Sequence, residues 1–185
     1  MTKILIVIGK SGTGKDTLVG VLSEMPFFNK VITTTTRPKR DYEIDGLNYH
    51  FITPEEFAHK ILDGSIIEAS CFNENWFYGT QDKDYDSKLI NILSCDPTRV
   101  SALLEASSEY DIDIIYLDTK DKVRLIRCLN REDNPDVSEI IRRYKTDEVD
   151  FSNLDFNYTV IENNGNLVKT VEDCMLHLKD IKWIE

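Results

Sequence analysis

The stretch Gly9-Lys10-Ser11-Gly12-Thr13-Gly14-Lys15 follows the apolar run Ile4-Leu5-Ile6-Val7-Ile8 directly. This spacing is the G-x-x-x-x-G-K pattern of a phosphate-binding loop (P-loop), which requires a buried strand before it and a helix after it. Backbone N–H groups of such a loop surround nucleotide phosphates, and the lysine reaches the β- and γ-phosphates. The glycines let the backbone approach the phosphates closely. We therefore predict an ATP-binding site here, and not a glycine-rich turn with an unrelated lysine.

One position departs from the P-loop pattern. The hydroxyl residue that usually follows the lysine and holds Mg²⁺ is replaced by Asp16, and Thr17 comes next. A carboxylate is a good hard ligand for Mg²⁺. We predict that both residues belong to the ATP site and that Asp16 is the metal ligand; alternatively, Asp16 only caps the helix, where its charge suits the helix dipole.

Composition restricts the class of protein. The 185 residues, 41% hydrophobic and 30% charged, suit one α/β domain, and a net charge of −11 argues against general nucleic-acid binding. No apolar stretch approaches the roughly 20 residues of a membrane span, and Ile4–Ile8 is too short for a signal peptide. We expect a cytoplasmic protein with no membrane contact. The four cysteines form no C-x-x-C pair, so neither zinc nor a disulfide framework is predicted.

Hydrophobic patterns predict strands alternating with helices. Core strands are expected at 3–8, 30–36, 89–95, 112–117 and 157–161. Helices are expected at 15–24, 54–63, 99–110, 120–129, 137–149 and 167–184. This alternation predicts a parallel sheet between helical layers. Residues 37–88, with a short strand at 49–52 and strands and turns at 65–85, form an insertion after the second core strand.

A basic segment, Thr35-Thr36-Arg37-Pro38-Lys39-Arg40, places three cations within four residues of an acidic chain. Arg37 and Arg40 can each present a planar fork of N–H donors to phosphate oxygens. The segment therefore indicates an anion site, although a solvated basic turn would have the same composition.

Further motifs follow in order, and the chain resembles the guanylate kinase family over almost its whole length. They are D-G-L-N-Y-H-F at 45–51, the helix start T-P-E-E-F at 53–57, I-I-E at 66–68, F-Y-G-T at 77–80 and V-I-E-N-N at 160–164. The resemblance implies a single three-layer α/β/α P-loop kinase domain. Its core would be 1–36, 89–126 and 150–185, with an inserted NMP-binding region at 37–88 and a helical lid at 127–149.

The resemblance also implies roles for acceptor-site residues. The phosphate of GMP would be bound by Arg37, Arg40, Tyr49 and Tyr78. Guanine would be read by Thr33, Glu68 and Asp96. Guanine presents N1–H and N2–H₂ donors together, so acidic acceptors suit it and disfavour adenine.

Lid arginines would stabilise the charge on the transferred phosphoryl group. The resemblance makes Arg127, Arg131 and Arg143 catalytic, together with Lys15 and Arg37, and it places Asn163 near adenine. Because Arg127 and Arg131 are four residues apart, a solvated helix face is the competing explanation for that pair.

The strand end near Asp96 departs from the family. The usual D-x-D-x-Q-G is replaced by Ser94-Cys95-Asp96-Pro97-Thr98, so the first Asp and the Gln-Gly are lost. We hypothesise that Asp16 restores, at the P-loop, the negative charge lost at Ser94.

The predicted function is transfer of the γ-phosphoryl group of MgATP to GMP or dGMP. The predicted ligands are ATP, GMP or dGMP, and Mg²⁺, with the chain a monomer or homodimer. Two alternatives stay open. One is a kinase with a different or broader acceptor, and the other is a nucleotide-binding pseudokinase or protein-binding module.

Overall fold

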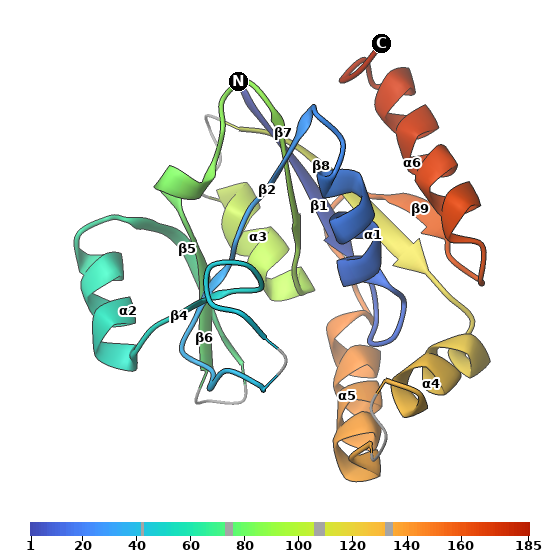
Figure 1. The fold of residues 1–185 in the computed structure, drawn as a ribbon, viewed down its shortest axis with the longest axis horizontal. Coiled ribbons are helices and arrows are strands. Elements are labelled where there is room, and N and C mark those ends of the chain that lie inside the picture. The colour runs from blue at the N-terminus through green and yellow to red at the C-terminus, as the bar shows by residue number, and fades with distance from the viewer. Residues whose placement is uncertain (42, 73–75, 106–109, 132–134) are drawn as a thin grey trace.

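A five-stranded parallel sheet forms the centre of the computed structural model (Figure 1). The structure describes residues 1–41, 43–72, 76–105, 110–131 and 135–185. The strand order is β2-β7-β1-β8-β9. The bounds are β1 Thr2–Ile8, β2 Phe28–Lys30, β7 Ile90–Ser94, β8 Tyr110–Asp118 and β9 Thr159–Glu162. All four pairings are parallel, which confirms the predicted core sheet.

Helices cover both faces of this sheet because β1 is apolar on both sides. Leu5 and Val7 point to one face, under α1 (Lys15–Ser23) and α6 (Leu167–Asp180), while Ile4, Ile6 and Ile8 point to the other, under α3 (Pro97–Glu105). Successive strand residues point to opposite faces, so a centrally placed strand shows no polar alternation. The result is the expected three-layer α/β/α arrangement.

Two peripheral parts flank the carboxyl ends of the core strands (Figure 1). One contains α4 (Asp121–Leu129) and α5 (Val137–Asp150). The other is a four-stranded sheet of order β4-β3-β6-β5 with one helix and a 3₁₀ turn. Its elements are β3 Thr34–Thr35, β4 His50–Phe51, α2 Pro54–Leu62, β5 Ile66–Phe72, β6 Trp76–Gln81 and η1 Asp82–Asp84.

The start of α2 follows from its sequence. Thr53 Oγ1 accepts a hydrogen bond from the Glu56 amide at 3.1 Å, and Glu56 Oε2 accepts from the Thr53 amide at 2.8 Å. This reciprocal capping box, with Pro54 at the first helical position, satisfies amides that have no partner within the helix.

Two predicted elements were wrong in their extent. The strand expected at 30–36 is divided, because β2 pairs with β7 in the core while Thr34 pairs with His50 and Gly79 in the second sheet. The helix expected at 99–110 ends at Glu105, and Tyr110 instead opens β8, paired in register with Thr2. Residues 106–109 of that prediction lie outside the described residues, as do 73–75 of the predicted insertion and 132–134 of the predicted lid.

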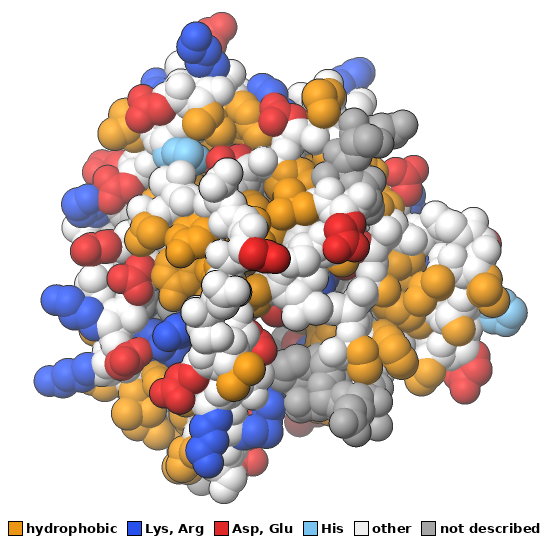
Figure 2. Space-filling model, turned by 180° about the vertical axis from the view of Figure 1, so that it is seen from behind, with side chains coloured by type: hydrophobic (Ala, Val, Ile, Leu, Met, Phe, Trp, Pro, Cys, Tyr) orange, Lys and Arg blue, Asp and Glu red, His pale blue; other side chains and the backbone are white. Residues whose placement is uncertain are grey.

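The back of the molecule carries charges of both signs. Lys and Arg side chains are interspersed with Asp and Glu side chains on the face shown in Figure 2. Within the described ranges, no helix combines the length and apolar character needed to cross a bilayer.

Candidate active site

The P-loop joins β1 to α1 through glycines in left-handed conformations. Gly12 has φ 80° and Gly14 has φ 95°, a region that favours glycine. A Cβ on Gly12 would lie 2.6 Å from the Arg124 carbonyl, and one on Gly14 would lie 2.7 Å from Asn163 Nδ2. Contacts with neighbouring segments of the chain therefore favour glycine at both positions, independently of the close approach that a bound phosphate would require.

The back of the P-loop is held by two residues that sequence reasoning had placed at the nucleotide. Arg127 Nη1 and Asn163 Nδ2 both donate to the Thr13 carbonyl, at 3.1 and 2.8 Å. Arg127 Nη2 also donates to the Asn163 carbonyl at 3.0 Å. Neither side chain lines the cavity formed in front of the loop, so both support the loop from its other side.

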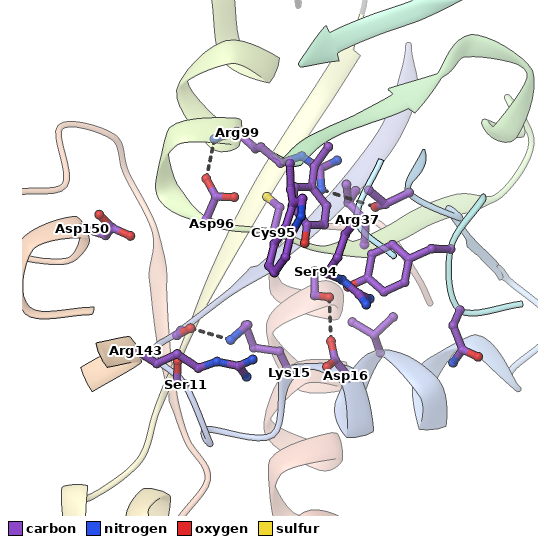
Figure 3. Close-up of a pocket in the computed structure, with 18 of the residues that line it drawn as sticks. Ser11, Lys15, Asp16, Arg37, Ser94, Cys95, Asp96, Arg99, Arg143 and Asp150 are labelled. Carbon is purple, nitrogen blue, oxygen red and sulfur yellow. Dashed lines mark hydrogen bonds between the residues drawn. The ribbon is translucent and has the colours of Figure 1, made fainter. Parts of the chain in front are cut away.

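A cavity of about 480 Å³ lies between the P-loop, the second sheet and α5 (Figure 3). The predicted site residues that line it are Gly9, Ser11, Lys15, Asp16, Thr33, Arg37, Arg40, Tyr49, Tyr78, Asp96, Arg131 and Arg143. Those that do not line it are Lys10, Gly12, Thr13, Gly14, Thr17, Glu68, Arg127 and Asn163. The cavity thus joins most of the predicted ATP and GMP residues in one place.

Lys15 lies at the floor of this cavity. Its Nζ donates to the Gly9 carbonyl at 2.6 Å. Burial lowers the pKa of Lys15, and the adjacent Asp16 carboxylate opposes that shift. A desolvated ammonium held at the loop is suited to contact phosphate oxygens.

The two departures from the family pattern meet in space. Ser94 Oγ donates to Asp16 Oδ1 at 2.9 Å, because β7 ends beside β1 and the P-loop (Figure 3). Arg131 Nη2 lies 3.8 Å from Asp16 Oδ2, and the Asp16 side chain is 69% exposed. The carboxylate is therefore oriented by the residue that replaces the family's aspartate and is accessible to a ligand.

Oxygen donors at this point fit Mg²⁺. Over the described part of the chain, no group of three or more His, Cys, Asp and Glu residues is arranged to hold a metal. Magnesium does not need one, since it is usually bound through one or two carboxylates together with substrate phosphates and water. Asp16, with the hydroxyl of Ser94 beside it, meets this requirement.

The predicted phosphate arginine Arg37 is buried against an acid that sequence reasoning missed. Arg37 Nη2 donates to Glu43 Oε1 at 2.7 Å, and the Arg40 amide donates to Glu43 Oε2 at 2.8 Å. Burial opposes the charge on Arg37, but the bond to and charge of Glu43, together with Tyr78, outweigh it and raise the arginine pKa. The guanidinium carbon also lies 5.3 Å from the ring centre of Tyr49. Burial raises the pKa of Tyr49 to about 12, so its hydroxyl remains a donor at neutral pH.

Arg99 is a second residue that sequence reasoning missed. It lies in the first turn of α3, lines the cavity and is 3% exposed. Arg99 Nη2 donates to Glu68 Oε1 at 2.7 Å. Burial opposes the charge on Arg99, but the Glu68 carboxylate, together with Cys95 and Asp96, outweighs it and raises the arginine pKa. The signal was present in the sequence, since the lost Gln-Gly would have occupied positions 98 and 99.

Asp147 of α5 is a third missed residue, and it contacts the P-loop directly. Asp147 Oδ2 accepts from the Ser11 amide at 2.8 Å and from Arg124 Nη2 at 2.7 Å. Arg124 Nε donates in turn to the Ser11 carbonyl at 2.9 Å, and its guanidinium stacks 4.5 Å from the ring centre of Tyr144. These contacts tie α4 and α5 to the loop.

Arg143 reaches the cavity from the same helix. Its Nε donates to Glu139 Oε1 at 2.8 Å, and Arg142 forms a fork with both oxygens of Glu139. The hydrogen bond from Arg142 is the main reason why the pKa of Glu139 is lowered to about 2. Glu139 therefore stays ionised and holds Arg143 beside the cavity.

The fold and this site define a P-loop nucleotide-binding protein with a second, inserted sheet. The guanylate kinase family model matches residues 1–183, and the chain belongs to the guanylate kinase family.

Individual relatives agree with this assignment. A guanylate kinase of Mesomycoplasma hyopneumoniae strain J is 30% identical, covering 98% of this chain and 94% of the relative. One from Mycoplasma genitalium is 28% identical, covering 92% and 72%. The crystal structure of a guanylate kinase from Anaplasma phagocytophilum aligns with a TM-score of 0.72 over 98% of this chain and 87% of that one. At 21% identity, this last match bears on the fold alone.

Proposed function

We propose that the chain transfers the γ-phosphoryl group of MgATP to GMP or dGMP, giving ADP and GDP or dGDP. One observation carries the proposal: the P-loop lysine Lys15 and the phosphate arginines Arg37 and Arg40 line a single cavity. A donor triphosphate on the loop and an acceptor phosphate on the arginines would then face each other. The relatives named guanylate kinase support the same reaction.

Phosphoryl transfer requires that the two phosphates be positioned in line and that their negative charge be neutralised. The acceptor phosphate is already nucleophilic, so no general base is required. Arg37, Arg40 and the neutral Tyr49 hydroxyl would hold that phosphate in line with the donor. Lys15 would neutralise charge that builds on the transferred group, and Arg131 and Arg143 would add positive charge from the other side of the cavity. Arg127 would contribute by holding the P-loop carbonyls.

Mg²⁺ bound with ATP would neutralise charge on the β- and γ-phosphates. In this proposal Asp16 is its protein ligand, directly or through water. Ser94 orients the carboxylate through the 2.9 Å hydrogen bond. Such a partner behind a ligand commonly tunes metal affinity.

The proposal extends to movements of the whole domain, to its compartment and to its oligomeric state. The division into a core, an NMP-binding insertion at 37–88 and a lid at 127–149 predicts that the two outer parts close over the substrates and exclude water. We propose that the reaction takes place in the cytoplasm. The oligomeric state, monomer or homodimer, stays a prediction.

A coupled ADP-release assay with MgATP tests the reaction. The panel is GMP, dGMP, AMP, CMP, UMP and dTMP, with Lys15→Ala as the inactive control. Turnover confined to GMP and dGMP supports the proposal. ATP binding without turnover on any acceptor would overturn it and indicate a pseudokinase.

A kinase with a different or broader acceptor is a second candidate, and the Arg99–Glu68 pair favours it. The carboxylate expected to read guanine is already bound by an arginine. Turnover on a pyrimidine acceptor in the same assay would select this candidate and leave the phosphoryl-transfer chemistry intact.

A further inference from the structure

The side chain that faces the acceptor end of the cavity is Arg99, and Glu68 lies behind it. Glu68 Oε1 accepts from Arg99 Nη2 at 2.7 Å and from Thr80 Oγ1 at 2.8 Å, while Oε2 accepts from Arg99 Nε at 3.3 Å. The Glu68 side chain is 1% exposed and does not line the cavity, whereas Arg99 does. Both carboxylate oxygens are therefore occupied by groups of the protein.

Arg99 keeps donors that point away from Glu68. Its Nη1 donates to Thr33 Oγ1 at 3.3 Å, so three of its five N–H groups have acceptors among the described residues. One N–H on each terminal nitrogen is left for a ligand. Asp96 Oδ1 accepts from the Arg99 amide at 3.0 Å and so fixes the start of α3 (Figure 3). The cavity wall therefore presents a buried guanidinium where a carboxylate was expected.

A guanidinium carries only hydrogen-bond donors, so it selects a base by the acceptors that the base presents. Guanine carries O6 and N7 acceptors on one edge, and arginine is their commonest side-chain partner. Adenine has an amino group in place of O6, which would oppose the N–H groups of Arg99. The 2-amino group of guanine needs an acceptor instead, and Arg99 stands between the cavity and the Glu68 carboxylate.

We propose that Arg99 determines the acceptor base by donating to O6 of a 6-oxopurine nucleotide, with Glu68 acting through Arg99 as a positioning residue. This inference rests on the proposed function and deepens it. In this arrangement the 6-oxo group is essential for binding of the base, and Glu68 makes no hydrogen bond to the 2-amino group. Hypoxanthine shares O6, N7 and N1–H with guanine, so IMP becomes an acceptor alongside GMP.

Two GMP analogues separate the contributions of the base groups. IMP lacks the 2-amino group, and 2-aminopurine riboside 5′-monophosphate keeps that group but lacks O6 and, with it, the N1–H. Calorimetric titration of the whole protein in the presence of MgADP is expected to show IMP within about 3-fold of GMP, and the 2-aminopurine nucleotide weaker by about 10-fold or more. A loss on removing the 2-amino group as large as the loss on removing O6 overturns the inference. If neither GMP nor any other monophosphate binds, the proposed function fails and the inference fails with it.

Variants of the pair give an independent test. Arg99→Gln alone leaves a buried carboxylate without its partner, so the double variant Arg99→Gln with Glu68→Gln is also made. We expect the double variant to bind MgADP normally and to lose its preference for GMP over the 2-aminopurine nucleotide. Retention of the full preference would overturn the role of Arg99.

Glu68→Gln distinguishes positioning from direct reading of the base. If Glu68 acts through Arg99, the variant weakens GMP and IMP binding by the same factor. If Glu68 reads the 2-amino group, GMP binding falls more than IMP binding, and the inference is wrong. Thr98→Ala, an exposed position in the same turn of α3, is the control and leaves the GMP-to-IMP ratio unchanged.

Discussion

Asp16 shows how one substitution can change the charge of a nucleotide site. Its carboxylate accepts from Ser94 and stands beside the P-loop lysine. A carboxylate there repels ATP without metal and attracts MgATP, so the sign of its effect depends on the metal. The helix-capping alternative predicts no such dependence on metal.

We expect Asp16→Ala to weaken MgATP binding by about 10-fold or more while ATP in EDTA binds as well as before or more tightly. The measurement is calorimetric titration with and without Mg²⁺, followed by turnover. Glu24→Ala removes an exposed charge at the other end of α1 and serves as the control. Unchanged MgATP affinity and full Mg²⁺-dependent turnover in Asp16→Ala would leave only the capping role.

A substitution at Tyr49 tests the predicted site for the acceptor phosphate. Because the pKa of Tyr49 is raised to about 12, the hydroxyl stays neutral at the near-neutral pH of a turnover assay and can donate to phosphate. We expect Tyr49→Phe to raise the KM for GMP by about 10-fold with little change in kcat, the effect of losing a bond to a charged group. Tyr158→Phe, an exposed tyrosine on another part of the chain, is the control.

Absorbance titration near the phenolate band checks the ionisation of Tyr49. The unfolded chain ionises near pH 10, so the stability contributed by the neutral hydroxyl is present below pH 10 and is lost as pH rises toward 12. The absorbance step that Tyr49→Phe removes from the titration of the folded protein should therefore lie near pH 12. A step removed near pH 10 would contradict the burial argument.

A buried ion pair, Arg124–Asp147, joins α4 to α5, and both of its members also bond to Ser11 of the P-loop. Asp147→Leu leaves Arg124, which is 2% exposed, without its main acid and should cost about 3–5 kcal/mol of unfolding free energy. Replacing both, as Arg124→Met with Asp147→Leu, should recover most of that loss because no buried charge is left unpaired. Urea denaturation measures both variants.

The matched control for this pair is an exposed one. Lys169→Met removes the Lys169–Asp173 bridge on the surface of α6 and should leave the unfolding free energy almost unchanged. If the double variant is no more stable than Asp147→Leu, the cost comes from lost packing or lost bonds to Ser11 instead of from the unpaired arginine.

Local patterns predicted the elements well, and distant contacts explain what they could not predict. The run Ile4–Ile8 and the capping box at Thr53 act within a few residues, so strand and helix starts were readable. Asp147 meets Ser11 across 136 residues, and Arg99 meets Glu68 across 31. A helical acid or arginine has the same local pattern whether it is solvated or buried. The lost Gln-Gly marked position 99 as changed, but only the fold shows that Asp147 contacts Ser11 and that Arg99 contacts Glu68.

At the scale of the molecule, the cavity lies between two sheets. Lys15 and Ser94 belong to the core, while Arg37 and Tyr78 belong to the inserted part. A ligand that bridges both parts stabilises the folded chain by mass action, by about 2.7 kcal/mol at one hundred times its Kd. For a chain of this length, that is about 5–10 °C in Tm.

We expect GMP at that concentration to raise Tm by about 5–10 °C, with MgADP adding its own shift. AMP in place of GMP should add far less, because its amino group faces Arg99. Arg40→Ala should remove most of the GMP shift and keep the MgADP shift, since Arg40 lines the cavity from the inserted part alone. Differential scanning calorimetry measures each combination. Equal loss of both shifts in Arg40→Ala would mean that the donor and acceptor sites are not carried by separate parts of the molecule.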